Sequence, residues 1–484
     1  MTAVAAGTPQ PGRRTLGDIA EEKAVVSARR TTRLLDSLFT TETMRDIFSD
    51  RGRLQSMLDF EAALARAEAS AGVVSSAAAA AIGTQCRAEL FDVDALATAA
   101  AQAGNPAIPL IKALTVLVAA HDADAARYVH WGATSQDAMD TGLVLQIRAA
   151  LSAIDKDLAQ LSTALAALAK THAATPLPGR TWLQQGPPVT LGLKAAGFLS
   201  AVERHRVRVR ELSRRVAVVQ FGGAVGTLAA LGERGLDVAA ALARELRLAL
   251  PDLPWHAQRD RIAETATTLG LIVGTLGKLA RDVSLLMQTE VGEAAEPSAP
   301  GRGGSSTLPH KRNPVASAAI LSAATRVPAL VSVMLAAMVQ EHERGLGGWH
   351  AEWETLPEIC TLTGGALAQA IAMVEGLQVD ASRMASNLEL TRGLILAEAV
   401  AMALADKLGK AEAHALVEEA SAAALAGRKS LREVLAADPR VTAQLSAAEL
   451  ERLLDPRNYL GQARALVTRA LAARNGEDDG AADA

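Results

Sequence analysis

Cysteine is scarce in this chain, with only Cys86 and Cys360 among 484 residues. Two cysteines supply neither a disulfide framework nor a cysteine-rich metal cluster. HExxH and CxxC spacings are also missing, so no zinc-type site is indicated. The GGAVG at 222–226 follows a helical pattern rather than a strand, which argues against a dinucleotide fingerprint. We therefore expect a protein of the reducing cytoplasm that needs no metal ion and no other cofactor.

A strong excess of either charge is absent as well, since the formal net charge is −4. Without a general basic face, neither nucleic acid nor an anionic membrane is indicated as a partner. Arg13 and Arg14 precede the acidic stretch DIAEEK instead of an apolar one, so they do not form a twin-arginine export signal. We expect residues 1–33 to form a flexible arm and residues 475–484 a disordered acidic tail.

Aromatic residues make up only 3% of the chain, and strand-type patterns are few. Alanine is abundant instead, and small residues allow helices to approach closely. Apolar residues recur at steps of three or four over 143–168, and similar stripes run over 195–219 and 262–283. Helices this long usually bury such stripes against other subunits. The prediction is an all-α fold of three domains: an N-terminal helical domain (34–130), a central bundle of long helices (131–375) and a C-terminal helical domain (376–474).

The most informative segment is GSSTLPHKRNP, residues 304–314. The preceding stretch is rich in Gly and Pro, so we expect a mobile loop over 291–312 that carries two serines and Lys311. Its glycines allow backbone N–H groups to point at an anion, and a helix starting near Pro314 would add the positive end of its dipole. A serine ionises more easily in a cationic field, so Ser305 or Ser306 is a candidate proton acceptor. The alternative is a disordered linker.

GSSTLPHKRNP resembles the GSSxMPxKxNP signature of the fumarase, aspartase and adenylosuccinate lyase superfamily, with Leu308 in place of methionine. The resemblance extends from about Leu38 to about Leu466. It implies that Ser305 is the general base and that Lys311 and Asn313 bind a substrate carboxylate. It also implies a homotetramer whose active sites are each assembled from three chains.

Two further segments point to carboxylate binding. HWGATSQDAMDT, at 130–141, places the hydroxyls of Thr134 and Ser135 where a carboxylate can be received, although helix capping by Ser135 or Asp137 is an alternative. In the segment 340–358, the forked guanidinium of Arg344 suits a carboxylate, and an exposed surface arginine is the alternative. For His130, substrate binding or proton transfer and a structural role are equally favoured.

The departures from adenylosuccinate lyases bear on the substrate. The stretch GRTWLQQ has Trp182 where those relatives place a histidine that acts as general acid, and GNPAIPL has Asn105 where they place another histidine. Segments with Trp131, Trp182, Trp349 and Trp353 suggest apolar pocket walls between cationic anchors. The expected substrate-binding residues also include Asn105, His130, Trp182, Gln185 and Ser306.

The motifs WGATSQD, GRTWLQ, QFGGAVGT and ERGLGGWHAEW together resemble the lactonising branch of the superfamily. Members of this branch close a dienoic tricarboxylate into a carboxymuconolactone during protocatechuate breakdown. A carboxylate needs no protonation to leave or attack, whereas an amine does, which fits Trp182. Two alternatives stay open: a lyase that releases fumarate from an adenylosuccinate-like or other succinyl substrate, and a catalytically silent helical scaffold.

Overall fold

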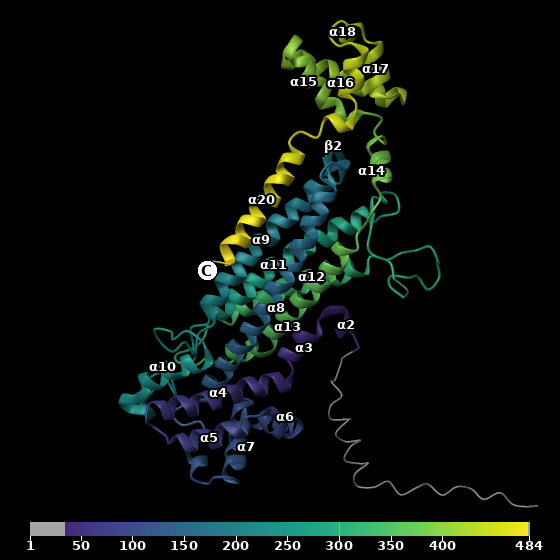
Figure 1. Ribbon diagram of the computed structural model, residues 1–484. Coiled ribbons are helices and arrows are strands. Elements are labelled where there is room, and N and C mark those ends of the chain that lie inside the picture. Colours follow the sequence, from purple (N-terminus) through teal and green to yellow (C-terminus); the bar gives the residue numbers. More distant parts are fainter. Residues whose placement is uncertain (1–33, 300, 483–484) are drawn as a thin grey trace, which may run out of the picture. The chain divides into compact units, whose positions relative to one another are not determined.

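The computed structural model describes residues 34–299 and 301–482, so the arm predicted for residues 1–33 lies outside it. The chain divides into two units, Met1–Leu38 and Phe39–Ala484. All the features below belong to the second unit, apart from the short helix α2 (Asp36–Phe39) at the division. This unit is dominated by helices, as the all-α prediction requires (Figure 1).

The first helices form a small core of their own. Ser49 caps the longest of them, α4, by accepting a hydrogen bond from the N–H of Gly52. Leu58, Leu110 and Leu114 are among the fully buried residues of this core. The elements are α3 (Glu42–Ile47), α4 (Asp50–Ser70), α5 (Ser76–Gln85), η1 (Ala88–Leu90), α6 (Val93–Ala103), α7 (Ala107–Ala119) and η2 (Ala125–Tyr128).

Long helices make the central bundle (Figure 1). The apolar stripes predicted over 143–168 and 262–283 each lie within one helix, whereas the stripe predicted over 195–219 continues beyond its helix, which ends at Val216. The stripe of α8 is buried because it packs on α4, α9 and α13. Its side chains from Ile147 through Leu151 and Ile154 to Leu165 are at most 1% exposed. The elements are α8 (Ser135–Thr171), α9 (Leu191–Val216), η3 (Ala229–Arg234), α10 (Gly235–Leu246), α11 (Asp260–Leu286), α12 (Val315–Ala336) and α13 (Gly348–Glu375).

Two short antiparallel pairs interrupt the helices. Strands β1 (Pro176–Thr181) and β2 (Gln184–Thr190) form a hairpin between α8 and α9. Its two turn residues, Trp182 and Leu183, both have positive φ, at 54° and 64°. This is the backbone of a tight two-residue hairpin turn. The second pair, β3 (Ala294–Ala295) with β4 (Gln378–Val379), ties the start of the signature loop to the segment after α13.

The last part of the chain has its own core around Val400, Leu404 and Leu431, after which the final helix returns along α9 (Figure 1). That helix is described through residue 482, and the acidic tail expected from residue 475 stays a prediction. The elements are α14 (Ala381–Leu388), η4 (Leu394–Leu396), α15 (Ala397–Leu408), α16 (Lys410–Gly427), α17 (Leu431–Ala437), α18 (Pro439–Thr442), α19 (Ala447–Leu453), η5 (Pro456–Asn458) and α20 (Ala463–Ala482).

Two helices, α12 and α13, are long and apolar enough to cross a membrane by length and composition alone. Core helices of soluble proteins pass the same test, and 72% of the apolar window of α13 is buried inside the fold. Only 28% of the corresponding window of α12 is buried, so much of its apolar surface faces outward. Val333 and Leu335 of α12 are 40% and 48% exposed, and Val339 just beyond it is 83% exposed.

Candidate active site

The N-terminus of α8 is the structural centre of one group of predicted site residues. Thr134 is the N-cap, with the extended backbone that this position requires, and Ser135 is the first helical residue. The cap is therefore Thr134, rather than Ser135 or Asp137 as considered from the sequence. Asp137 completes a capping box because its Oδ2 accepts a hydrogen bond from the N–H of Thr134 at 3.0 Å.

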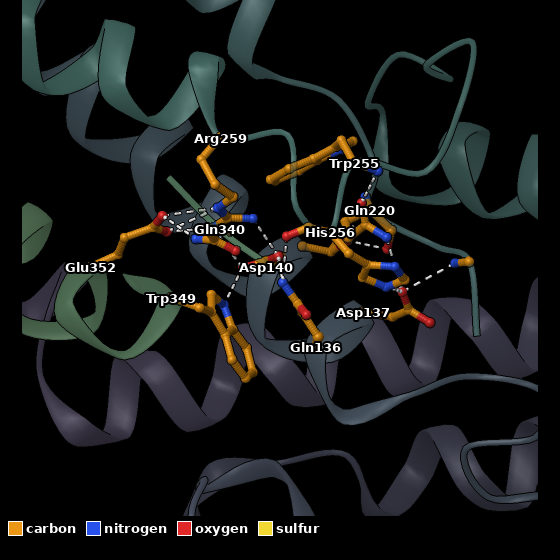
Figure 2. Close-up of polar contacts among 12 residues, drawn as sticks. Gln136, Asp137, Asp140, Gln220, Trp255, His256, Arg259, Gln340, Trp349 and Glu352 are labelled. Carbon is orange, nitrogen blue, oxygen red and sulfur yellow. Dashed lines mark hydrogen bonds and ion pairs between the residues drawn. The ribbon is translucent and has the colours of Figure 1, made fainter. Parts of the chain in front are cut away.

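Asp137 is fully buried and joins this helix to the glycine-rich loop at 220–226 (Figure 2). Besides Thr134, four groups lie within hydrogen-bond distance of its carboxylate. They are the backbone N–H groups of Gly222 (3.1 Å) and Gly223 (2.9 Å), Nε2 of Gln220 (3.1 Å) and Nε2 of His256 (2.7 Å). A carboxylate with five such partners fixes the loop and the helix start in one arrangement.

Arg344 reaches this arrangement from the loop between α12 and α13. One guanidinium nitrogen, Nη2, donates to Oγ1 of Thr134 at 3.1 Å and to the carbonyl of Ala224 at 3.0 Å. Its Nε is buried and has no hydrogen-bond partner among the described residues. Arg344 is thus a half-buried group held beside Thr134, not a freely exposed surface arginine.

His130 lies immediately before this helix start, in the left-handed backbone region with φ at 59°. Its Nδ1 is 2.6 Å from Oε1 of Glu61, a carboxylate on α4 that is 2% exposed. Burial disfavours a charged imidazole here, but Glu61 and the more distant Asp137 outweigh burial and raise the pKa of His130. The sequence does not predict this role for Glu61, because no pattern along its helix indicates a contact with residue 130.

A second buried network lies beside this region (Figure 2). The guanidinium of Arg259, at the start of α11, binds Asp140 at 2.7 and 3.1 Å and Glu352 at 2.5 to 3.2 Å. Nε1 of Trp349 donates to Asp140 at 3.1 Å. Trp349 is only 4% exposed, so this tryptophan supports the charge network and is not an apolar pocket wall within one chain.

The signature loop forms a closed turn of its own. A bridge pairs Gly304 with Arg312, and the N–H of Asn313 donates to the carbonyl of Gly303 at 2.8 Å. Inside this turn, Oγ of Ser305 accepts hydrogen bonds from the backbone N–H groups of Thr307 (3.2 Å) and Leu308 (3.0 Å). Donors aimed at a hydroxyl oxygen favour its ionised form.

The other signature side chains differ in exposure. Ser306 and Lys311 are exposed, and Asn313 is half-buried. Lys311 and Ser305 both lie within the turn that the Gly304–Arg312 bridge closes.

Two buried glutamates hold the ends of this loop. Glu293 accepts two hydrogen bonds from Arg180 of β1, at 2.6 and 2.9 Å, and one from Asn387 at 2.8 Å. Glu296 accepts from the N–H groups of Ala316 (2.9 Å) and Ser317 (2.8 Å) in the first turn of α12. The expectation that this helix N-terminus serves an anion at the loop is therefore corrected, because the carboxylate of Glu296 already occupies those donors.

One chain does not bring the two groups of residues together. The signature loop enters α12 at one end and Arg344 follows its other end, and 22 residues of helix span about 33 Å.

The remaining predicted site residues lie elsewhere. Trp182 is 98% exposed at its hairpin tip, and Gln185, in the same hairpin, has a buried Oε1 without a partner among the described residues. The side chain of Asn105 caps α7 by accepting from the N–H of Ile108 at 3.1 Å.

Family models match most of the chain: the lyase model covers residues 38–329, and the adenylosuccinate lyase C-terminus model covers 393–470. The chain belongs to this lyase family. The family predicted from GSSTLPHKRNP is thereby confirmed. A protein of Pseudomonas aeruginosa named 3-carboxy-cis,cis-muconate cycloisomerase is 64% identical to this chain. The match covers 91% of this chain and 96% of that protein.

Solved structures of similar proteins share the fold. The 3-carboxy-cis,cis-muconate lactonizing enzyme of Pseudomonas putida superposes with a TM-score of 0.88 at 59% identity, covering 91% of this chain and 98% of that one. The β-carboxy-cis,cis-muconate cycloisomerase of Acinetobacter calcoaceticus gives a TM-score of 0.87 at 44% identity, covering 91% and 100%. The helical superfamily fold is thus shown along the chain.

Proposed function

We propose that the chain is a cycloisomerase that interconverts 3-carboxy-cis,cis-muconate and a carboxymuconolactone in the protocatechuate branch of aromatic catabolism. The observation that carries this proposal is 64% identity, over nearly the whole chain, to a protein named for that reaction. The intact signature supports it, since Ser305, Lys311 and Asn313 are all present. We further propose that the enzyme works in the cytoplasm and needs no metal ion or other cofactor.

The chemistry is an addition of one substrate carboxylate to a carbon–carbon double bond of the same molecule. Negative charge develops on the carbon next to another carboxylate, and that carbon then gains a proton. We assign the proton transfer to Ser305, whose oxygen is stabilised by two backbone donors when ionised. Lys311, Asn313 and Arg344, with the hydroxyls of Thr134 and Ser135, hold the carboxylates and stabilise the developing charge.

The enzyme is proposed to act as a homotetramer with sites shared between chains. Support comes from α12: its length of about 33 Å lies between the segment that carries Ser305 and the one that carries Arg344, and its outward apolar side chains need a cover. A second chain meets both requirements if it brings its own signature loop to the Arg344 end of the first. Light scattering should find a tetramer, and an active monomer would contradict the shared site.

The runner-up is a lyase that releases fumarate from a succinyl substrate. Trp182 disfavours an amine-releasing version, because its indole cannot supply the proton that an amine leaving group needs. The other alternative, a silent scaffold, is disfavoured by the retained signature side chains.

The deciding experiment mixes the pure protein with 3-carboxy-cis,cis-muconate and follows the loss of diene ultraviolet absorbance. Adenylosuccinate is the comparison substrate. Turnover of the muconate alone supports the cycloisomerase. Turnover of adenylosuccinate alone establishes the lyase, and turnover of neither refutes the cycloisomerase and an adenylosuccinate lyase.

A further inference from the structure

Glu61 is a buried carboxylate with a single neutralising partner. It is 2% exposed, its Oε1 contacts Nδ1 of His130 at 2.6 Å, and its Oε2 has no hydrogen-bond partner among the described residues. An ionised carboxylate in such a place is costly unless a positive charge lies beside it. The nearest candidate for that charge is the imidazole of His130.

The groups that face His130 come from three elements. Glu61 on α4 contacts the ring directly. Asp137 on α8 adds negative charge nearby, although its own oxygens are already occupied by five partners. Arg344, from the loop after α12, brings a positive charge to Thr134, four residues after His130, and is held there by Thr134 and Ala224. Two carboxylates therefore face His130, and the closer one is the less well satisfied.

Glu68 provides a contrast on the same helix. It lies seven residues after Glu61 and is 0% exposed, and neither of its oxygens has a partner among the described residues. Burial, with a smaller effect of Glu61, raises the pKa of Glu68 to about 9, so Glu68 is neutral at pH 7. Glu61 contacts an imidazole, and Glu68 has no such partner among the described residues.

The backbone also fixes where the imidazole lies. The positive φ of His130 is unusual for a residue with a side chain, and the surrounding structure holds it there. The segment packs tightly on the glycine loop, since a Cβ added to Gly223 would lie 2.9 Å from the carbonyl of Gly132. With Nδ1 committed to Glu61, Nε2 is the free nitrogen, and no hydrogen bond to it exists within residues 34–299 and 301–482.

We propose that Glu61 is a positioning residue that keeps His130 as an imidazolium, so that Nε2–H of His130 donates a charge-assisted hydrogen bond to a substrate carboxylate. This inference rests on the proposed function. A tricarboxylate carries three negative charges, and Lys311 and Arg344 supply only two of the matching cations. His130 supplies the third, from the same end of the site as Arg344 and Thr134.

The test is the pH dependence of kcat/KM for 3-carboxy-cis,cis-muconate in wild type, Glu61→Gln and Glu68→Gln. His130 loses its charge as the pH rises through its raised pKa, so KM should rise on the basic side. Glu61→Gln removes the charge that favours protonation, so this basic limb should move to lower pH by about one unit or more. At pH 7.5, KM should rise about tenfold while kcat changes less. Glu68→Gln should leave the limb in place.

His130→Gln gives an independent measurement if Glu61→Gln does not fold. It should raise KM at low pH and remove the basic limb. A folded Glu61→Gln enzyme with an unmoved limb, or a limb that persists in His130→Gln, overturns this inference alone. A wild-type protein without turnover of 3-carboxy-cis,cis-muconate overturns the proposed function and this inference with it.

Discussion

Replacing Ser305 by alanine is the most direct test of the catalytic assignment. The change removes one oxygen that accepts two backbone hydrogen bonds, and it touches no bond that closes the loop, since the Gly304–Arg312 bridge and the Asn313–Gly303 bond are made by the backbone. The loop should therefore keep its shape. A positioned acid or base contributes about 10²- to 10⁴-fold, so kcat should fall by that factor, which corresponds to roughly 3 to 5 kcal/mol of barrier.

Steady-state loss of diene absorbance measures kcat and KM for the Ser305→Ala enzyme, with circular dichroism and light scattering as controls for fold and assembly. Ser306→Ala is the matched variant, because Ser306 is the exposed neighbour in the same turn and is expected only to bind substrate. It should raise KM and change kcat less. Near-wild-type turnover in a folded Ser305→Ala enzyme would refute the serine assignment.

Three further outcomes are expected. Trp182→Phe should retain much of the activity, since it keeps most of the ring and loses only size and the indole N–H, whereas a variant as inactive as Ser305→Ala would mean that the tryptophan takes part in the reaction. Turnover should survive chelation by EDTA and dialysis; activity that is lost and then restored by a divalent ion would contradict the cofactor-free mechanism. Glu68 has a pKa raised from 4.5 to about 9, so its contribution to stability is full below pH 4.5 and declines as the pH rises towards 9, by at most about 1.4 kcal/mol per pH unit. Glu68→Gln should flatten the fall of the melting temperature between pH 5 and 8.5, and parallel curves for the two proteins would show that Glu68 ionises normally.

The long helices could be predicted from the sequence, because apolar residues that recur at helical spacing are enough to indicate a helix. The residues from Leu143 to Leu168 predicted α8 with its length, since burial at 3.6-residue spacing is a local property of the chain. The hairpin was missed: its strands are short, and Pro178, Pro187 and Pro188 hide the alternation by which strands are recognised.

The signature loop and the N-terminus of α8 were identifiable as functional segments, but their supporting contacts were not. Glu61 and His130 are 69 residues apart, and Arg259 reaches acids on two other helices. Such contacts depend on how the helices pack against one another, which no single stretch of sequence encodes. Glu296 illustrates the error that follows, because the sequence predicted free N–H donors at the start of α12 where a buried carboxylate had already taken them.

The two halves of the proposed site differ in how firmly they are held. At the α8 end, Asp137 and Arg259 are buried in networks that leave Thr134 and Arg344 little freedom, so the carboxylate anchors are organised before substrate arrives. The signature turn follows Glu293 and Glu296 in the chain, and it is held by its own backbone bonds and by Arg312, which donates to the carbonyl of Glu296 and to the side chain of Gln378. This arrangement suits the proposed reaction. Rigid carboxylate anchors at the α8 end hold the substrate in a curled conformation, and the serine on the separate turn then delivers a proton. We therefore expect substitutions at the α8 end to act mainly on KM and those in the signature turn mainly on kcat.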